Sequence, residues 1–133
     1  MTKVLIDENL SEYFADGLNK IQFPLHNELE ITSIAKEFYK GIKDEDWIPK
    51  LGAKSGIFIT QDLNITKSRH QAGLLLNYHL GAFFLKVPKN YKYWDKVSLL
   101  IDKWQEIVKV IEKNKRPFAF EITPRKITRL SLK

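Results

Sequence analysis

The sequence predicts an α/β fold in which helices cover both faces of a mostly parallel sheet. Three short and largely apolar runs, at residues 4–6, 57–60 and 82–85, have the continuous hydrophobic character of strands that are buried on both faces. Stretches whose apolar residues follow helical spacing separate these runs. Strands and helices that alternate in this way are typical of an α/β sandwich. With 133 residues, the chain is long enough for a single domain with its own core.

The first ninety residues are predicted to form the α/β core. The strand at residues 4–6 is followed by a helix over residues 10–21, for which Asn9 can serve as the N-cap. Residues 23–26 are predicted to form a short return strand, whose proline places it at a sheet edge or at the start of a strand. Residues 27–40 fit either a short helix or an extended strand. A later helix is predicted over residues 67–80, with Gly81 at its end.

Between these elements, three consecutive acids at residues 44–46 precede a short helical segment. Proline is tolerated in the first turn of a helix, where its missing N–H has no intrahelical partner to lose. Pro49 therefore favours Asp46 as the N-cap, with residues 47–49 as the first turn. A start at Asp44 is the alternative.

Residues 91–133 are predicted to form a long amphipathic helix followed by a basic C-terminal strand and tail. The helix is predicted over residues 93–113, a strand over 118–122 and a partner strand over 127–130. All three tryptophans lie on apolar helix faces, so we expect them in the core. Tyr91 and Tyr93, with the neighbouring lysines, are an alternative candidate for a surface on which bases stack.

Charge is unevenly distributed along the chain. Residues 1–85 contain 9 Lys and Arg against 11 Asp and Glu, whereas residues 86–133 contain 13 against 5, so the two parts carry −2 and +8. An acidic site beside a basic flank suits a polyanionic ligand, although lysines on a solvated helix give the same count. The absence of cysteine excludes disulfides and thiolate metal sites. No apolar stretch is long enough to span a membrane, so we expect a cytoplasmic protein.

Three acidic groups are predicted to meet at one edge of the sheet. Asp7 and Asp62 each follow a predicted strand, and the carboxyl ends of parallel strands converge on a common crevice. Carboxylates held close together repel each other unless a cation neutralises them. The sequence therefore predicts a Mg²⁺ or Mn²⁺ site formed by Asp7, Asp44 or Asp46, and Asp62, with Asn64 as a further oxygen ligand. The alternatives are that Asp7 caps the first helix and that Asp44 and Asp46 interact only with a helix dipole.

Other polar residues give weaker indications. Lys67 and Arg69 follow Asp62 closely enough to bind a phosphate near it, although both also suit a solvated helix face. The three histidines do not have the spacing of a zinc site.

Four short motifs together resemble the compact PIN-like domains of VapC-type toxins. They are D-E-N-L at residues 7–10, D-E-D-W-I-P at 44–49, I-F-I-T-Q-D at 57–62 and R-H-Q-A at 69–72. The resemblance implies a three-layer sandwich and a Mg²⁺- or Mn²⁺-dependent ribonuclease. It further implies the toxin of a type II toxin–antitoxin pair, neutralised by a cognate antitoxin protein. A homodimer is compatible with this assignment.

The resemblance assigns roles to individual residues. Asp7 matches the metal ligand after the first strand, Asp44 the acid that opens the D-E-x-W helix, and Asp62 the acid of the T-x-D motif. Since Pro49 favours Asp46, both acids are kept as candidates. Where many PIN nucleases carry a further acid, in the pattern T-x-D-x-D, this chain has Asn64, which implies a weaker second metal or a one-metal site.

The implied reaction is attack of a metal-activated water on an RNA phosphodiester, leaving a 5′-phosphate and a 3′-hydroxyl. The basic residues of the last third are expected to hold the RNA backbone or to contact the antitoxin; they include Arg116, Arg125, Lys126 and Arg129.

Two other functions fit parts of the sequence. A receiver-type phospho-acceptor domain also has acids after its first strand and a Lys-Pro element, similar to residues 86–88, but it has no role for the acidic triplet. A PIN-like scaffold that binds a partner without catalysis would explain Asn64.

Overall fold

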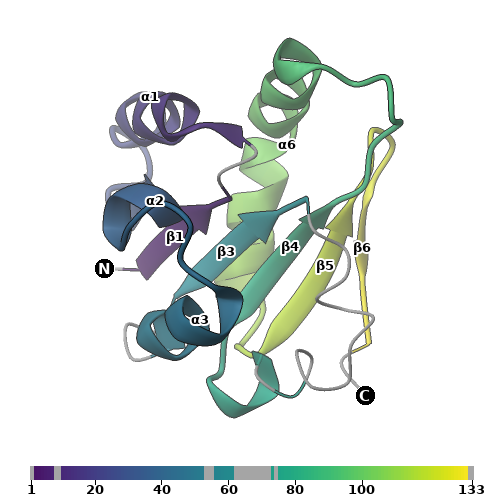
Figure 1. Cartoon of the computed structure of the whole chain (residues 1–133). Helices are drawn as coiled ribbons and strands as arrows, with labels where there is room; N and C mark the ends of the chain where they lie inside the picture. The colour runs from purple at the N-terminus through teal and green to yellow at the C-terminus, as the bar shows by residue number, and fades with distance from the viewer. Residues whose placement is uncertain (1, 8–9, 53–55, 62–72, 74, 132–133) are drawn as a thin grey trace.

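The computed structural model describes residues 2–7, 10–52, 56–61, 73 and 75–131 (Figure 1). Within these ranges the chain forms a sheet of six strands in the order β2-β1-β3-β4-β5-β6. The first five strands in this order are parallel to one another, and β6 is antiparallel to β5. The strands are β1 Thr2–Ile6, β2 Leu29–Ser33, β3 Ile57–Thr60, β4 Gly81–Leu85, β5 Phe118–Ile122 and β6 Ile127–Arg129. The predicted α/β fold with a mostly parallel sheet is confirmed.

Helices cover both faces of this sheet, as expected for a three-layer sandwich. They are α1 Glu12–Gln22, α2 Ile34–Glu37, α3 Asp44–Gly52 and α6 Tyr93–Lys113. Side chains of α1 and α6 pack on one face against Ile57 and Ile59, and those of α3 pack on the other against Phe58. Successive residues of a strand point to opposite faces, so a strand covered on both sides must be apolar throughout. This explains the continuous hydrophobic runs in the sequence.

The return strand lies later in the chain than predicted. Residues 23–26 form a turn in which the N–H groups of Leu25 and His26 donate to the carbonyl of Gln22 at 3.2 and 3.0 Å. The strand is β2, and Ser33 at its end caps the short helix α2 by accepting from the Lys36 N–H at 3.0 Å. The prediction for residues 23–26 is therefore wrong, and residues 27–40 contain both a strand and a helix.

Helix α1 begins at Glu12, and its N-cap is Ser11 instead of Asn9, which lies outside the described residues. The Ser11 hydroxyl accepts hydrogen bonds from the N–H groups of Tyr13 and Phe14 at 3.1 and 3.2 Å. These bonds satisfy two amides that have no intrahelical acceptor.

Helix α3 begins at Asp44, so the alternative start is confirmed and the prediction of an Asp46 cap is wrong. The carbonyl of Lys43 accepts from the N–H groups of Asp46 and Trp47 at 2.9 and 3.1 Å. Pro49 consequently lies inside the helix, beyond its first turn. Burial of the neighbouring Trp47 and Ile48, which are 2% and 0% exposed, compensates for the hydrogen bond that proline cannot donate.

The tryptophans do not all lie in the core. Trp47 and Trp104 are buried, but Trp94 in the first turn of α6 is 74% exposed, so the prediction fails for this residue. Helical spacing gives the side of a helix on which a residue lies, but not how far the neighbouring layer extends along the helix.

Gly81 is the first residue of β4, so the prediction that it ends the preceding helix is wrong. His79 takes the left-handed conformation at this connection, with φ of 54°. Gly81 is required for a different reason, because a Cβ there would lie 2.5 Å from Cζ of the buried Phe118.

Replacing Gly81 with alanine is expected to lower the free energy of unfolding by about 1–3 kcal/mol, since the Phe118 ring would have to move within a filled core. Gly17→Ala is a matched control, because Gly17 is in α1 and a Cβ there has no neighbour within 4 Å. This control is expected to raise the stability by up to about 1 kcal/mol. Urea denaturation measures both changes. Equal stability of Gly81→Ala and the wild type would contradict the packing described for β4.

Lys3 links three elements at the β2 side of the sheet. Its Nζ lies 2.6 Å from Glu37 Oε1 and 3.2 Å from Glu30 Oε1. Burial lowers the pKa of Lys3, but the hydrogen bonds and charges of Glu37 and Glu30 outweigh it and raise this pKa above 10.5. A raised pKa means that the ion pairs stabilise the fold fully below pH 10.5 and are lost as the pH rises through the folded-state value.

We therefore expect Lys3→Met to reduce the free energy of unfolding by about 1–2 kcal/mol at neutral pH. The difference from the wild type should shrink when the pH rises about one unit above the ordinary lysine pKa. Urea denaturation at both pH values tests this. A difference that stays constant would show that the charge of Lys3 contributes nothing.

Candidate metal site and nucleic-acid surface

The carboxyl ends of β1, β3, β4 and β5 lie at one edge of the sheet because these strands run in the same direction (Figure 1). Asp7 directly follows β1, Thr60 is the last residue of β3, and Lys86 directly follows β4. The turn between β5 and β6 contains Arg125 and Lys126 and belongs to the same edge. In open α/β sheets this edge is where ligands bind.

Asp7 is held in a defined orientation at this edge. Its Oδ2 accepts a hydrogen bond from Thr60 Oγ1 at 2.7 Å, and its N–H donates to the carbonyl of Ile59 at 3.0 Å. Thr60 is 3% exposed, so its hydroxyl needs a partner inside the protein. The neighbouring strand therefore fixes the carboxylate of Asp7. Thr60 is the threonine of the T-x-D motif, and the sequence alone does not indicate this role for it.

The remaining predicted ligands are described only in part. Asp46 is exposed in the first turn of α3, while the side chain of Asp44 and all of Asp62 and Asn64 lie outside the described residues. In the described part of the chain, no group of three potential ligands includes Asp7 or Asp46. The convergence of the acids on one metal stays a prediction.

A different trio of potential ligands was not found from the sequence. His26, Glu28 and Glu112 have ligand atoms within 4.8 Å of one another. Glu112 belongs to the last turns of α6 and is far from the other two in sequence, so no spacing motif indicates the group. Both glutamates are exposed, and exposed carboxylates at such distances are common without a metal.

The predicted phosphate-binding cations do not share one surface. Arg125 and Lys126 are exposed in the β5–β6 turn, which is fixed by their N–H groups donating to Thr123 Oγ1 at 3.3 and 3.2 Å. Arg116 is half-buried and precedes β5, at the edge opposite Asp7.

The other cations are either engaged elsewhere or not described. Arg129 on β6 donates to Asn114 Oδ1, and its guanidinium lies 5.2 Å from the centre of the Phe120 ring. Lys67 and Arg69 lie outside the described residues. Of the predicted cations that are described, Arg125 and Lys126 share an edge with Asp7.

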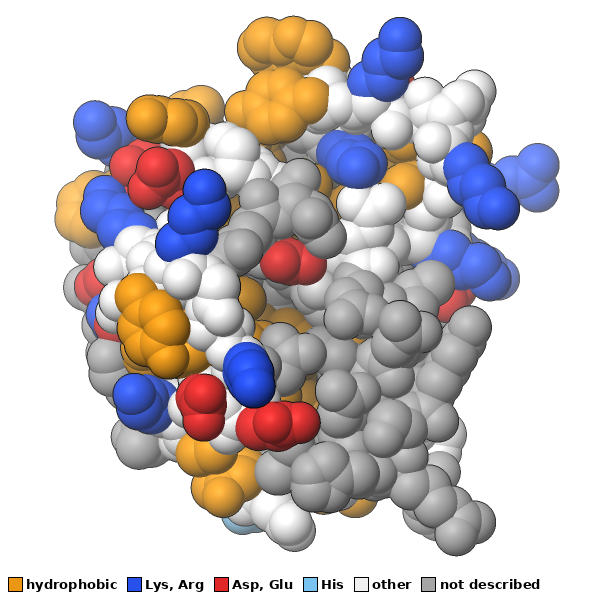
Figure 2. All heavy atoms as spheres, viewed as in Figure 1, with side chains coloured by type: hydrophobic (Ala, Val, Ile, Leu, Met, Phe, Trp, Pro, Cys, Tyr) orange, Lys and Arg blue, Asp and Glu red, His pale blue; other side chains and the backbone are white. Residues whose placement is uncertain are grey.

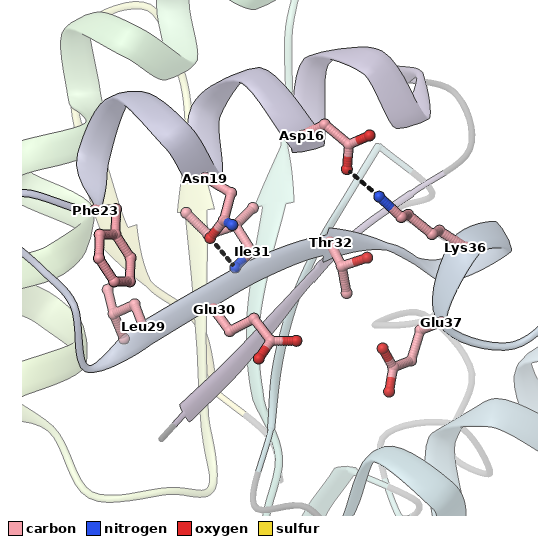
Figure 3. Close-up of a pocket in the computed structure, with 9 residues that line it drawn as sticks. All are labelled: Asp16, Asn19, Phe23, Leu29, Glu30, Ile31, Thr32, Lys36 and Glu37. Atoms are coloured by element: carbon pink, nitrogen blue, oxygen red, sulfur yellow. Dashed lines mark hydrogen bonds and ion pairs between the residues drawn. The ribbon is translucent and has the colours of Figure 1, made fainter.

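A polar pocket of about 400 Å³ lies beside the edge strand β2 (Figure 3). Asn19 Oδ1 accepts from the Ile31 N–H at 2.9 Å, and Asp16 pairs with Lys36 at 2.9 Å. Asn19 thus occupies a backbone donor that an unprotected edge strand would offer to another chain. None of the predicted site residues lines this pocket, and its contacts account for protection of the edge.

Comparison with known families distinguishes the PIN-like assignment from the receiver-type one. Residues 2–87, about two thirds of the chain, match the family described as PIN like domain. The chain belongs to the PIN-like domain family. Searches of curated proteins and of solved structures each found no match.

The PIN-like match runs from β1 through β4, and so contains Asp7, the acidic triplet and Asp62. PIN-like domains are often nucleases. Helix α6 and strands β5 and β6 follow the matched segment and continue the same sheet and core. Among the described helices, none has the length and apolar character needed to cross a lipid bilayer.

Proposed function

We propose that this PIN-like domain is a Mg²⁺- or Mn²⁺-dependent endoribonuclease and the toxin of a type II toxin–antitoxin pair. The observation that carries the proposal is the Asp7 carboxylate at the carboxyl edge of the sheet. Its Oδ2 accepts a hydrogen bond of 2.7 Å from Thr60 Oγ1, which orients it. A carboxylate fixed at this position, in a family that often holds nucleases, is suited to metal-dependent hydrolysis.

The donor set suits the proposed ion. Asp7, Asp44 or Asp46, Asp62 and Asn64 all offer hard oxygen ligands, which Mg²⁺ and Mn²⁺ prefer. When bound, the ion would supply a water of lowered pKa and neutralise charge on the leaving oxygen. Asp7 would hold the ion, and Thr60 would keep the Asp7 carboxylate in the rotamer that faces it.

The RNA backbone would follow the same edge away from the acids. Arg125 and Lys126 are exposed there and would bind phosphates without reading the base sequence. Lys67 and Arg69 are proposed to contact the phosphate next to Asp62, and Arg116 and Arg129 to bind more distant phosphates or the antitoxin. The cognate antitoxin is the proposed protein partner.

The test is cleavage of a circular single-stranded RNA by the purified protein with Mg²⁺, with Mn²⁺ and with excess EDTA. An endonuclease with a metal-activated water is expected to open the circle only when metal is present, and to leave a 5′-phosphate and a 3′-hydroxyl. A folded protein that leaves the circle intact with both metals would contradict the proposal and favour a non-catalytic PIN-like scaffold.

A further inference from the structure

An exposed aromatic pair stands at the start of α6. Trp94 is 74% exposed and Tyr93 is 41% exposed, and their ring centroids are 5.5 Å apart at an angle of 74°. We call Tyr93, Trp94 and three lysines of the connection that leads to them, Lys86, Lys89 and Lys92, the Trp94 platform. Exposed apolar residues that are contiguous and rimmed by polar ones are typical of a binding surface.

The platform is rigidly attached to the domain. Its two rings belong to the first turn of a helix of 21 residues, whose buried side chains include Val97, Leu100 and Trp104. The N–H of Lys92 donates to Asp95 Oδ2 at 2.8 Å, which fixes the first turn. Trp94 is therefore exposed in a first turn that is capped and belongs to a packed helix.

The chain segment that contains the rings is basic. Residues 86–96 contain four lysines and one aspartate, a net charge of +3, and the aspartate is the one that caps α6. Lys86, Lys89 and Lys92 are exposed, and none of them pairs with an acid in the part of the chain that the structure describes. Figure 2 shows hydrophobic side chains at the top of the molecule, with Lys and Arg side chains beside them.

One residue of the platform, Lys86, lies at the edge that carries the candidate metal site. Lys86 directly follows β4, and its N–H donates to the Ile122 carbonyl of β5 at 2.9 Å. Strand β4 is two places from β1 in the sheet, so the chain positions after these two strands are roughly 10 Å apart. The connection from β4 then leads to the start of α6 above this edge (Figure 1).

We propose that the Trp94 platform binds single-stranded RNA, with one base stacked on Trp94 and the neighbouring phosphates on Lys86, Lys89 and Lys92. Exposed rings among cations fit a polyanion whose bases have free faces, whereas a duplex hides these faces. The inference rests on the proposed nuclease, because it names the surface that would hold the substrate strand beside Asp7. Its chemistry is binding, so it can be tested without cleavage.

The experiment measures the binding of a fluorescein-labelled oligouridine in EDTA, by fluorescence anisotropy, to the wild type and to variants. Trp94→Ala is expected to raise the Kd at least about fivefold, whereas Trp94→Phe keeps a stacking ring and should bind nearly as the wild type does. Phe23→Ala is the matched control. Phe23 is likewise an exposed aromatic residue, at 51%, but it lies at the C-terminal end of α1, beside β2.

Intrinsic fluorescence gives a second readout, because Trp94 is the one exposed tryptophan of the three in the chain. Unlabelled oligouridine should quench the wild-type emission and leave that of Trp94→Phe unchanged. An equal Kd for Trp94→Ala and the wild type would overturn the proposal. So would an equal loss of oligouridine affinity in Phe23→Ala, or tighter binding of the wild type to anionic phospholipid vesicles than to oligouridine.

The two proposals fail separately. If the oligonucleotide binds through Trp94 but circular RNA stays intact with metal, the platform stands and the nuclease does not. If the circle is cleaved but Trp94→Ala binds like the wild type, the nuclease stands and the platform does not.

Discussion

Replacing Asp7 with asparagine is expected to lower the rate of RNA cleavage at least about 100-fold, because loss of a metal ligand should cost more than loss of a residue that only orients one. Asparagine has nearly the same shape and can still accept a hydrogen bond from Thr60, so the fold should remain. It lacks the charge that neutralises the ion. Cleavage of circular RNA with Mn²⁺ measures the effect, and the circular dichroism spectrum checks the fold.

Two further variants accompany this prediction, one as a control and one with a smaller expected loss of activity. Asp102→Asn, on the exposed surface of α6, should cleave as the wild type does. Thr60→Val removes the hydrogen bond to Asp7 and leaves the charge, so we expect a loss of about 10-fold. Wild-type cleavage by Asp7→Asn would rule out Asp7 as a ligand, and wild-type cleavage by Thr60→Val would rule out its positioning role.

Replacing Phe58 with alanine is expected to lower the free energy of unfolding by about 3–5 kcal/mol. Phe58 is 0% exposed at the centre of β3. Its ring lies edge to face with the rings of Trp47 and Phe84, with centroid distances of 5.0 and 6.0 Å. The substitution removes both ring contacts and leaves a cavity between the sheet and α3. Domains are typically stable by only about 5–15 kcal/mol, so the loss is a large part of the total.

Urea denaturation measures this change, with Tyr13→Ala as the control. Tyr13 is an aromatic residue on α1 that is 77% exposed, so its replacement should change the stability by less than about 0.5 kcal/mol. Similar stability losses in the two variants would contradict the packing of Phe58 between β3 and α3.

Elements that are buried on both faces, or that are long, could be predicted from the sequence. The apolar runs at β1, β3 and β4 and the spacing of α6 depend on burial alone, which the residue types express directly. Strand β2 was misplaced because it is at an edge and is polar in part, while the turn before it contains Phe23 and Leu25. Of the two predicted starts of α3, the one favoured by Pro49 is wrong because tertiary burial of Trp47 and Ile48 outweighs the local preference of Pro49.

The position of the candidate site could be predicted as far as the direction of the strands could be predicted. Asp7 follows β1, so a parallel sheet places it at the carboxyl edge together with Thr60. The hydrogen bond between them joins neighbouring strands far apart in sequence, and no local pattern indicates it. Charge alone does not distinguish Arg116 from Arg125. Arg116 precedes β5 and Arg125 follows it, so the two residues lie at opposite edges of the sheet.

The most direct test of the account is Mn²⁺ binding, measured by electron paramagnetic resonance, to the wild type, Asp7→Asn and Glu112→Gln. Glu112 belongs to the other group of potential ligands, with His26 and Glu28, and serves as the control. We expect the wild type and Glu112→Gln to bind Mn²⁺ equally and Asp7→Asn to bind it at least about tenfold more weakly. Unchanged binding by Asp7→Asn, or binding that is lost in Glu112→Gln instead, would contradict a metal site at the carboxyl edge of the sheet.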